Sequence, residues 1–281
     1  MTRLKSTDVE AIEPSLFEYD NKLKRICGCS LWEVACRAAD LNTADLELIK
    51  NSTCNIHIVP VNSGLGIITG FTESLKSIIS HLGFSVVLSE TTDVVGMSQA
   101  IEKKADLVFM ADDHRFVIYD LKNRNIIDNN PATALGYITA LDLMTKGIHS
   151  KSVLILGCGP VGLAAAKAVI KCGGRVSVFD IDLSKSEVLA KSIQNTEGAD
   201  IRIETDFRKA LKSYRLIVDA TPAADIIDIT NIQVDTHIVA PGVPCGITKT
   251  AITQYPDQIL HDPLQLGVAT MLALALKKSD H

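Results

Sequence analysis

A glycine-rich segment at residues 157–162, Gly-Cys-Gly-Pro-Val-Gly, constrains the fold of this 281-residue chain more than any other feature. It follows a short apolar run at residues 152–156 and opens an alanine-rich stretch, the setting of a turn between a buried strand and a helix. In such a turn Gly157 permits the sharp change of direction, Gly159 lets the backbone approach a pyrophosphate, and Gly162 lets the helix pack against the strand. The segment predicts a dinucleotide-binding Rossmann fold with the phosphates at the helix N-terminus.

A carboxylate after the second expected strand indicates which dinucleotide this fold would hold. Asp180 lies eighteen residues beyond Gly162, at the end of the run Arg-Val-Ser-Val-Phe. Its side chain can accept hydrogen bonds from the ribose hydroxyls of NAD and would repel the extra phosphate of NADP. Pro160 and Val161 complete the cofactor-binding turn. We therefore predict NAD as the cofactor, with FAD or a plain glycine turn as the alternatives.

Two later segments extend the cofactor site toward the nicotinamide ring. Residues 219–222 (Asp-Ala-Thr-Pro) and 240–244 (Ala-Pro-Gly-Val-Pro) each end an apolar run typical of a strand. Ligands of open α/β sheets bind at this carboxyl edge of the strands. Thr221, Pro222 and Pro241 are therefore candidates for the nicotinamide pocket, and plain turns are the alternative interpretation.

The remaining pattern predicts an α/β protein with two domains. The first fifty residues have a helical pattern, and residues 55–120 alternate between strand-like and helix-like segments, which favours a small, largely parallel sheet. A polar loop that ends at Pro131 predicts the boundary. We divide the chain into a helical and α/β substrate domain at 1–131 and a C-terminal Rossmann domain at 132–281, which includes the C-terminal helix. Its first helix would bridge the two domains.

Composition excludes several classes of partner. The chain has 28 basic and 33 acidic residues, a net charge of −5, and no basic stripe of the kind that binds nucleic acid. Its apolar runs are far shorter than the roughly 20 residues that cross a membrane.

The N-terminus does not have the pattern of a signal peptide, and seven cysteines are best explained as reduced thiols, so we expect a cytoplasmic protein. Cys27, Cys29 and Cys36 do not match a zinc-binding spacing, so we expect no metal.

Two segments of the N-terminal half are candidates for substrate binding. Ser63 and Gly64 belong to a glycine-rich loop between a strand and a helix, where backbone N–H groups could hold a carboxylate. Asp112, Asp113 and His114 follow the run Asp-Leu-Val-Phe-Met-Ala. Because adjacent residues of an extended chain point to opposite faces, at most one of the two aspartates would face a shared cleft. From the residues alone, an ordinary turn explains either segment equally well or better.

Several of these segments together resemble a known family. The stretches VPVNSGLGIITGFTESL, FMADDHRFVIYDLKN and NNPA, followed by DATPAADII, APGVPCGI and DPLQLGVATML, are similar in sequence and order to the PylD family of pyrrolysine-forming dehydrogenases. The resemblance covers roughly residues 55–272. It includes segments that are unrelated to generic NAD binding, so it is more specific than the glycine motif.

The resemblance implies a substrate and a reaction. Enzymes of this family oxidise L-lysine that carries 3-methyl-D-ornithine on its ε-nitrogen, transferring hydride from the carbon that bears the ornithine side-chain amine to NAD. Hydrolysis of the imine releases ammonia, and the aldehyde condenses with the ornithine α-amine to close a pyrroline ring. The protein would orient a zwitterionic substrate against the nicotinamide and remove a proton.

The resemblance also implies roles for particular residues. Asp112 would bind the amine and favour its deprotonation, and Ser63 with its loop and Asn129 would hold the amino-acid termini. The substrate site would be lined by Ser63, Gly64, Phe71, Asn129 and Asp262. This chain departs from the family near the C-terminus, where a glutamate before Pro-Leu-Gly is replaced by Asp262 and the glycine by Gln265. The contact of that carboxylate with the substrate is therefore an open point.

Two other functions are compatible with the sequence. The first is an NAD-dependent dehydrogenase of another amino acid or imino acid, and the second is a non-catalytic NAD(H)-binding sensor. A homodimer is also compatible with the sequence, as is an N-terminal helix that moves when substrate binds.

Overall fold

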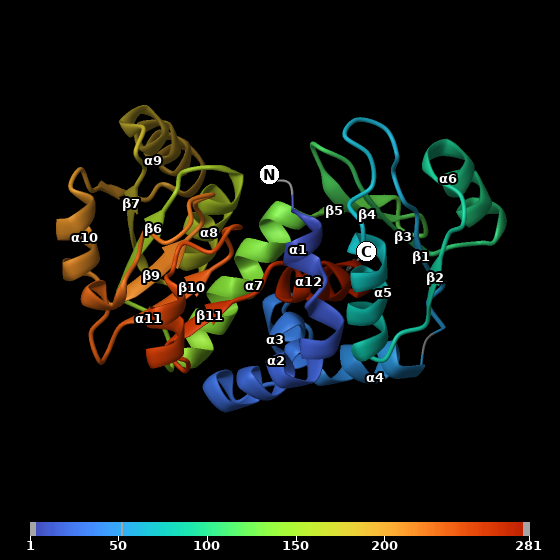
Figure 1. The fold of residues 1–281 in the computed structure, drawn as a ribbon, viewed down its shortest axis with the longest axis horizontal. Helices are drawn as coiled ribbons and strands as arrows, with labels where there is room; N and C mark the ends of the chain where they lie inside the picture. The colour runs from blue at the N-terminus through green and yellow to red at the C-terminus, as the bar shows by residue number, and fades with distance from the viewer. Residues whose placement is uncertain (1–3, 52, 278–281) are drawn as a thin grey trace.

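The computed structural model describes residues 4–51 and 53–277, which form two β-sheets joined by helices (Figure 1). As expected, the N-terminal segment is helical, with α1 (Ser6–Val9), α2 (Ile12–Cys27), α3 (Leu31–Ala38) and α4 (Thr43–Asn51). Gly28, in the left-handed conformation, ends α2. Ser30 then begins α3 with a capping box, in which the Glu33 carboxylate accepts a hydrogen bond from the Ser30 N–H at 2.7 Å.

The first sheet has five strands in the order β2-β1-β3-β4-β5. Its elements are β1 (Ile56–Ile58), α5 (Phe71–His81), β2 (Val86–Leu88), α6 (Asp93–Glu102), β3 (Leu107–Ala111), β4 (Phe116–Asp120) and β5 (Asn125–Asp128). Strands β1, β2 and β3 are parallel, but β4 and β5 form antiparallel hairpins. The expectation of a largely parallel sheet is therefore wrong for its last two strands. Strand β5 lies in the segment that the sequence predicts as a polar loop. The sequence does not indicate a strand there because Ile126 and Ile127 are its only apolar residues.

The second sheet is parallel throughout and has six strands in the order β11-β10-β9-β6-β7-β8. Its elements are β6 (Ser152–Leu156), α8 (Pro160–Lys171), β7 (Arg175–Phe179), α9 (Leu183–Glu197), β8 (Arg202–Ile203), α10 (Phe207–Ser213), β9 (Leu216–Asp219), a 3₁₀ turn (Ile229–Asn231), β10 (His237–Ala240), α11 (Lys249–Gln254) and β11 (Ile259–His261). Read from β8, this is the doubly wound 3-2-1-4-5-6 order. The predicted α/β class and the Rossmann fold are confirmed.

Two long helices lie between the sheets (Figure 1). Helix α7 (Asn129–Met144) packs on α8 on one side and on α12 (Gln265–Leu276) and α3 on the other, so it bridges the two halves as expected. Gly136 allows the close approach of α7 to α12, because a Cβ there would lie 2.5 Å from the Thr270 hydroxyl. Nearly every side chain of α12 is buried.

The C-terminal helix does not pack as the sequence order suggests. It packs on α7, which the sequence-based division also assigns to the Rossmann domain, but in addition on α3, α5 and strands of the first sheet. Val268, Met271 and Leu272 share an apolar core with Phe71 and Phe109 of the N-terminal half. A helix that is apolar on all sides needs partners on all sides, and the space between the two sheets provides them. Leu266, Ala269 and Ala273 lie in the other core, with residues of the second sheet. We therefore propose that α12 joins the two domains rather than belonging to the Rossmann domain alone.

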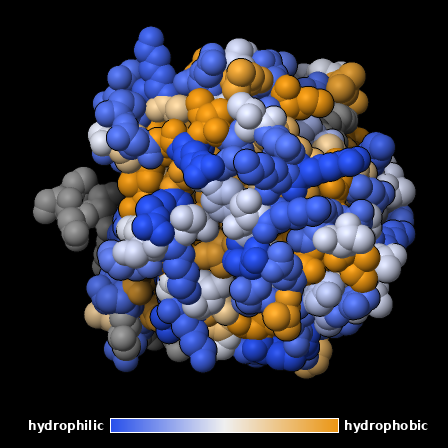
Figure 2. All heavy atoms as spheres, turned by 90° about the vertical axis from the view of Figure 1, so that its left-hand side faces the viewer, coloured by the Kyte–Doolittle hydropathy of each residue, from blue (hydrophilic) through white to orange (hydrophobic). Residues whose placement is uncertain are grey.

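The outer face of the Rossmann half is largely hydrophilic, with hydrophobic residues scattered over it (Figure 2). Isolated exposed apolar side chains are normal on globular proteins. Within residues 4–51 and 53–277, no helix combines the length and the apolar character needed to cross a membrane.

Candidate active site

The phosphate-binding turn has the geometry that its glycines predict. Gly157 has a φ of +88°, and a Cβ on it would lie 2.9 Å from the Ala220 carbonyl oxygen. A Cβ on Gly162 would collide with the Gly157 carbonyl oxygen, so only glycine allows α8 to start against β6. Pro160 occupies the first turn of α8, where its missing N–H costs no hydrogen bond.

The surroundings of Gly159 show whether this turn has room for a dinucleotide. It is the N-cap residue of α8, and no side chain caps the helix there. A Cβ on Gly159 would meet no atom within 4 Å, so open space lies directly before the helix N-terminus. Uncapped N–H groups and the positive end of a helix dipole favour an anion at this point. The turn therefore fits the pyrophosphate of a dinucleotide.

Asp180 lies beside the turn, and backbone N–H groups hold its carboxylate in place. Its Oδ2 accepts a hydrogen bond from the Cys158 N–H at 2.8 Å, and its Oδ1 accepts one from the Asp182 N–H at 3.0 Å. Each carboxylate oxygen can accept more than one hydrogen bond, so ribose hydroxyls can still bind this side chain.

A large cavity between the two halves collects the predicted cofactor residues. It contains about 1240 Å³ of empty space, part of it open to solvent. Of the predicted cofactor residues only Gly162 does not line it; the lining includes Gly157, Gly159, Pro160, Val161, Asp180, Thr221, Pro222 and Pro241. Leu4 and Asn129 of the N-terminal half also line this cavity, as does Asp262, which follows β11. We call this the interdomain cavity.

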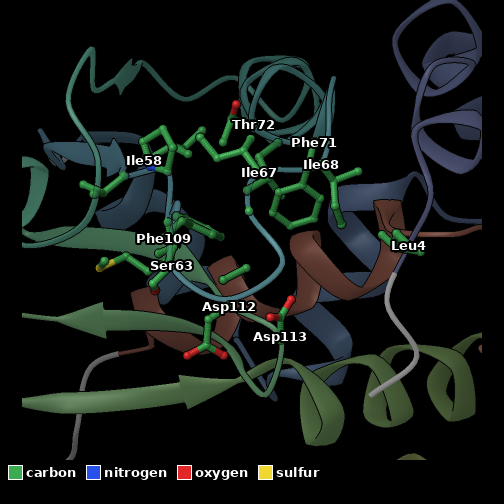
Figure 3. Close-up of a pocket in the computed structure, with 17 residues that line it drawn as sticks. Leu4, Ile58, Ser63, Ile67, Ile68, Phe71, Thr72, Phe109, Asp112 and Asp113 are labelled. Atoms are coloured by element: carbon green, nitrogen blue, oxygen red, sulfur yellow. The ribbon is translucent and has the colours of Figure 1, made fainter.

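A second, smaller cavity lies within the N-terminal half, and we call it the apolar cavity (Figure 3). It contains about 710 Å³ of empty space and is lined mainly by apolar side chains such as Ile58, Phe71 and Phe109. Ser63 and Asp112 also line it. Leu4 lines both cavities, so they are neighbours. The proposed substrate residues are therefore divided between two adjacent spaces, except Gly64, which is not among the residues that line either cavity.

Asp112 lies in the tight turn between β3 and β4. Its Oδ1 accepts hydrogen bonds from the backbone N–H groups of His114 and Arg115, each at 2.7 Å. These bonds, that from Arg115 foremost, lower the pKa of the Asp112 carboxyl below its ordinary value. The side chain is exposed, so it is a carboxylate at neutral pH that a cationic ligand can reach.

Its neighbour Asp113 points in a different direction and binds the glycine-rich loop (Figure 3). The Asp113 Oδ2 accepts a hydrogen bond from the Leu65 N–H at 2.7 Å. Gly64 has a φ of +74°, and a Cβ there would collide with the same carboxylate. Asp113 therefore holds the Ser63 loop against the turn that carries Asp112. The two adjacent aspartates have separate hydrogen-bond partners, but both line the apolar cavity, so the expectation that at most one of them would face a shared cleft is wrong.

Asn129 opens α7 at the edge of the interdomain cavity. It is 9% exposed, and its Oδ1 accepts a hydrogen bond from the Thr133 hydroxyl at 3.0 Å. The preceding residue, Asp128, caps α7 by accepting a hydrogen bond from the Asn130 N–H at 3.0 Å. Asp128 also pairs with Arg115 at 3.0 Å, which connects the start of α7 to the turn that carries Asp112.

Asp262 is at the centre of a buried cluster that the sequence did not reveal. Only 4% of it is exposed. Its Oδ2 accepts a hydrogen bond from Tyr19 and one from Tyr137 at 2.8 Å. Its Oδ1 accepts from the Leu264 and Leu266 N–H groups at the start of α12, at 3.0 and 3.2 Å. Burial and the adjacent carboxylate raise the pKa of both phenols well above the ordinary value.

Asp262 lines the interdomain cavity, but the roughly four acceptor positions of its carboxylate are filled by Tyr19, Tyr137 and the start of α12. We therefore propose that Asp262 fixes α2, α7 and α12 relative to one another rather than binding the substrate. Gln265, the other departure from the family pattern, is 4% exposed, and its Oε1 accepts a hydrogen bond from the Leu264 N–H at 3.2 Å. The two substitutions therefore act at the same helix start.

The cysteines were expected to be reduced, and all seven are free thiols. Burial raises the pKa of Cys27 and Cys36 to about 12. Among the residues that the structure describes, no group of three or more His, Cys, Asp or Glu side chains has an arrangement that could hold a metal ion.

Two family models match the chain. Residues 8–127 match the N-terminal domain of the pyrrolysine biosynthesis protein PylD, and residues 132–253 match the C-terminal domain of alanine dehydrogenase/PNT. The boundary between the two matches lies close to Pro131.

Solved structures agree with the fold. Quinate dehydrogenase from Corynebacterium glutamicum, solved in complex with NAD, has a TM-score of 0.56 at 14% identity, over 80% of this chain and 93% of that one. Shikimate dehydrogenase from Aquifex aeolicus has a TM-score of 0.51 at 15% identity, over 80% and 92% of the two chains. At these identities the likeness shows a similar fold over most of each chain.

Full-length relatives identify the family. Pyrrolysine synthase of Methanosarcina acetivorans is 32% identical over 274 residues, which cover 97% of this chain and 98% of that protein. Pyrrolysine synthase of Methanosarcina barkeri is 30% identical over 272 residues and 97% of each chain. At this identity and coverage the relationship extends over both halves of the molecule, and the chain belongs to the PylD family of pyrrolysine synthases.

Proposed function

We propose that this protein catalyses the NAD-dependent, pyrrolysine-forming oxidation of L-lysine-Nε-3-methyl-D-ornithine. The family membership supports the reaction, and the interdomain cavity supports the cofactor. The observation that carries the proposal is that a turn suited to a pyrophosphate and an exposed carboxylate, charged at neutral pH, lie in two neighbouring cavities. Such a pair suits an enzyme that must hold an ammonium group near a nicotinamide.

The cofactor would lie along the edge of the second sheet. Its pyrophosphate would lie before the N-terminus of α8, its adenosine ribose at Asp180, and its nicotinamide beside Thr221, Pro222 and Pro241. When bound, NAD supplies the acceptor for the hydride. The carboxylate of Asp180 disfavours a 2′-phosphate, which supports NAD rather than NADP.

The substrate would enter between the two cavities near Leu4. Asn129 and the Ser63 loop carry hydrogen-bonding groups suited to amino-acid termini, and Phe71 offers an apolar surface for methylene groups. Oxidation removes a hydride and a proton from the CH–NH unit and leaves an imine. Water then replaces ammonia to give an aldehyde, and condensation of the aldehyde with the ornithine α-amine releases one water as the ring closes.

Asp112 is suited to holding the substrate ammonium. A carboxylate next to an ammonium group stabilises the charged form of the amine, and the lowered pKa of Asp112 makes it a weak proton acceptor. Asp112 would therefore orient the amine strongly but deprotonate it only weakly. This differs from the role inferred from resemblance, because the two backbone N–H donors could not be read from the sequence. We expect the rate to rise with pH as the bound amine loses its proton.

Steady-state kinetics with the synthetic conjugate tests the proposal. NADH absorbance and product mass are followed together, and NADH formation with a product that has lost ammonia and closed a ring supports it. Asp112→Asn should raise KM for the conjugate by about tenfold while KM for NAD stays within about twofold, because one charge-assisted hydrogen bond is lost. Protein that binds NADH but turns over other amino or imino acids instead would contradict the substrate assignment.

A further inference from the structure

Asp219 is a buried carboxylate at the carboxyl end of β9, directly behind the interdomain cavity. It is 0% exposed, and it is not among the residues to which the sequence analysis assigns a role. Burying a carboxylate costs free energy unless hydrogen bonds compensate, so its partners indicate what it does. Burial raises the pKa of Asp219, and the hydrogen bonds from Thr221 act in the opposite direction.

Asp219 holds two segments that line the cavity. Its Oδ1 accepts hydrogen bonds from the Thr221 N–H at 3.1 Å and from the Thr221 hydroxyl at 2.7 Å. Its backbone carbonyl oxygen accepts one from the Gly242 N–H at 3.0 Å. Thr221 and Gly242 both line the interdomain cavity. One buried residue thus fixes the ends of two neighbouring strands.

Two glycines allow the segment at residues 241–246 to pack closely against Asp219. A Cβ on Gly246 would collide with the Asp219 Oδ2, and a Cβ on Gly242 would collide with the Thr221 carbonyl oxygen. Residues 241–246 therefore wrap around Asp219 and contact the 220–222 segment directly. The wall of the cavity formed by these two segments is a single packed unit.

We propose that the Asp219 side chain is the positioning group for the nicotinamide end of the cofactor, acting through Thr221. The inference rests on the proposed function, which puts the nicotinamide against this wall. Asp219 itself touches no ligand. Its side chain fixes the position of Thr221, and its backbone carbonyl binds Gly242. Gly159 and Asp180, which would hold the pyrophosphate and the adenosine ribose, follow other strands of the sheet, β6 and β7.

A comparison of the affinities for two ligands distinguishes a positioning role at the nicotinamide from a general structural role of Asp219. NADH carries a nicotinamide, and ADP-ribose has the same adenosine and pyrophosphate without it. The amide oxygen of Asp219→Asn accepts the two Thr221 hydrogen bonds less strongly than the carboxylate does. We therefore expect the Kd for NADH to rise about tenfold while the Kd for ADP-ribose changes by less than about twofold, measured by calorimetry. Thr221→Val, which removes only the hydroxyl donor, should show the same selectivity more weakly, and it serves if Asp219→Asn does not fold. Thr221→Ser, which keeps both donors, should bind NADH like wild type.

Asp228→Asn is the matched control. Asp228 also accepts hydrogen bonds from the N–H and hydroxyl of a threonine two residues later, but it does so on the exposed surface. It should leave both dissociation constants unchanged. Equal weakening of NADH and ADP-ribose in Asp219→Asn, or no weakening of either, would overturn the positioning role. Wild-type protein that bound neither ligand would refute the proposed function itself, and the inference with it.

Discussion

The two sides of the active-site region are built differently. On the cofactor side the phosphate-binding turn is formed by backbone atoms. Gly157, Gly159 and Gly162 leave room that side chains would fill. The substrate side is made of side chains that come from distant parts of the chain, such as Asp112 in the β3–β4 turn and Asn129 on α7. A backbone-built site has a short sequence signature, and a site built from side chains does not.

Within the substrate side, two carboxylates show how differently the same group can be used. Asp112 is exposed, and two backbone N–H groups lower its pKa. Asp262 is buried and accepts hydrogen bonds from Tyr19, Tyr137 and the start of α12. The first is available to a ligand, and the second holds the protein together.

The largest expected effect tests the cofactor side by comparing two glycines. In Gly162→Ala the new methyl group collides with the Gly157 carbonyl oxygen, so α8 must move and the pyrophosphate site is lost. We expect NADH affinity to fall by about 100-fold or more, with a lower melting temperature, because overpacking at a backbone contact is costly. Calorimetry and thermal unfolding measure the two effects.

Gly159→Ala is the counterpart, because its methyl group points into open space. This variant should melt within about 2 °C of wild type, since no atom of the protein is displaced. Its NADH affinity should still fall, because the methyl group stands where the pyrophosphate approaches. A Gly159→Ala protein that binds NADH normally would show that the dinucleotide does not use this turn.

The next effect concerns the stability of the two carboxylate sites. Asp262→Ala removes the carboxylate acceptor of the Tyr19 hydroxyl and the Leu266 N–H, while Tyr137 and Leu264 keep a second acceptor each, and we expect a loss of about 3 kcal/mol in the free energy of unfolding. Asp112→Ala should cost no more than about 0.5 kcal/mol, because the turn is exposed to water. Urea denaturation of both variants measures the difference. Similar costs would mean that the buried cluster is not a structural centre.

These contrasts also explain what the sequence could predict. The glycine spacing and Asp180 indicated the cofactor half because strand, turn and helix are consecutive there. The antiparallel β5 was missed because only two apolar residues mark it. The cluster at Asp262 could not be foreseen, since Tyr19 is 243 residues away and no local pattern connects them. Resemblance supplied Asp112, but its lowered pKa depends on a turn geometry that only the structure reveals.

The smallest effect tests the buried cluster through pH. The pKa values of Tyr19 and Tyr137 are raised in the folded protein, foremost by burial, so the folded state binds their protons more tightly than the unfolded state does. Their contribution to stability is complete below the unfolded pKa of about 10 and is lost progressively above it, at no more than about 1.4 kcal/mol per tyrosine and pH unit. Urea midpoints measured between pH 8 and pH 11 should therefore fall.

Other groups titrate in the same range, so the slope has to be isolated by difference. Tyr214 and the buried cysteines Cys27 and Cys36 also have raised pKa values and destabilise the protein at alkaline pH. The Tyr19→Phe/Tyr137→Phe double variant keeps all of these and removes only the two phenols. It should start less stable at pH 8, because Asp262 loses two donors, but its stability should decline less steeply above pH 10. Parallel slopes for wild type and double variant would mean that the two phenols ionise as readily in the folded protein as in the unfolded chain. That result would contradict a buried tyrosine pair bound to the Asp262 carboxylate.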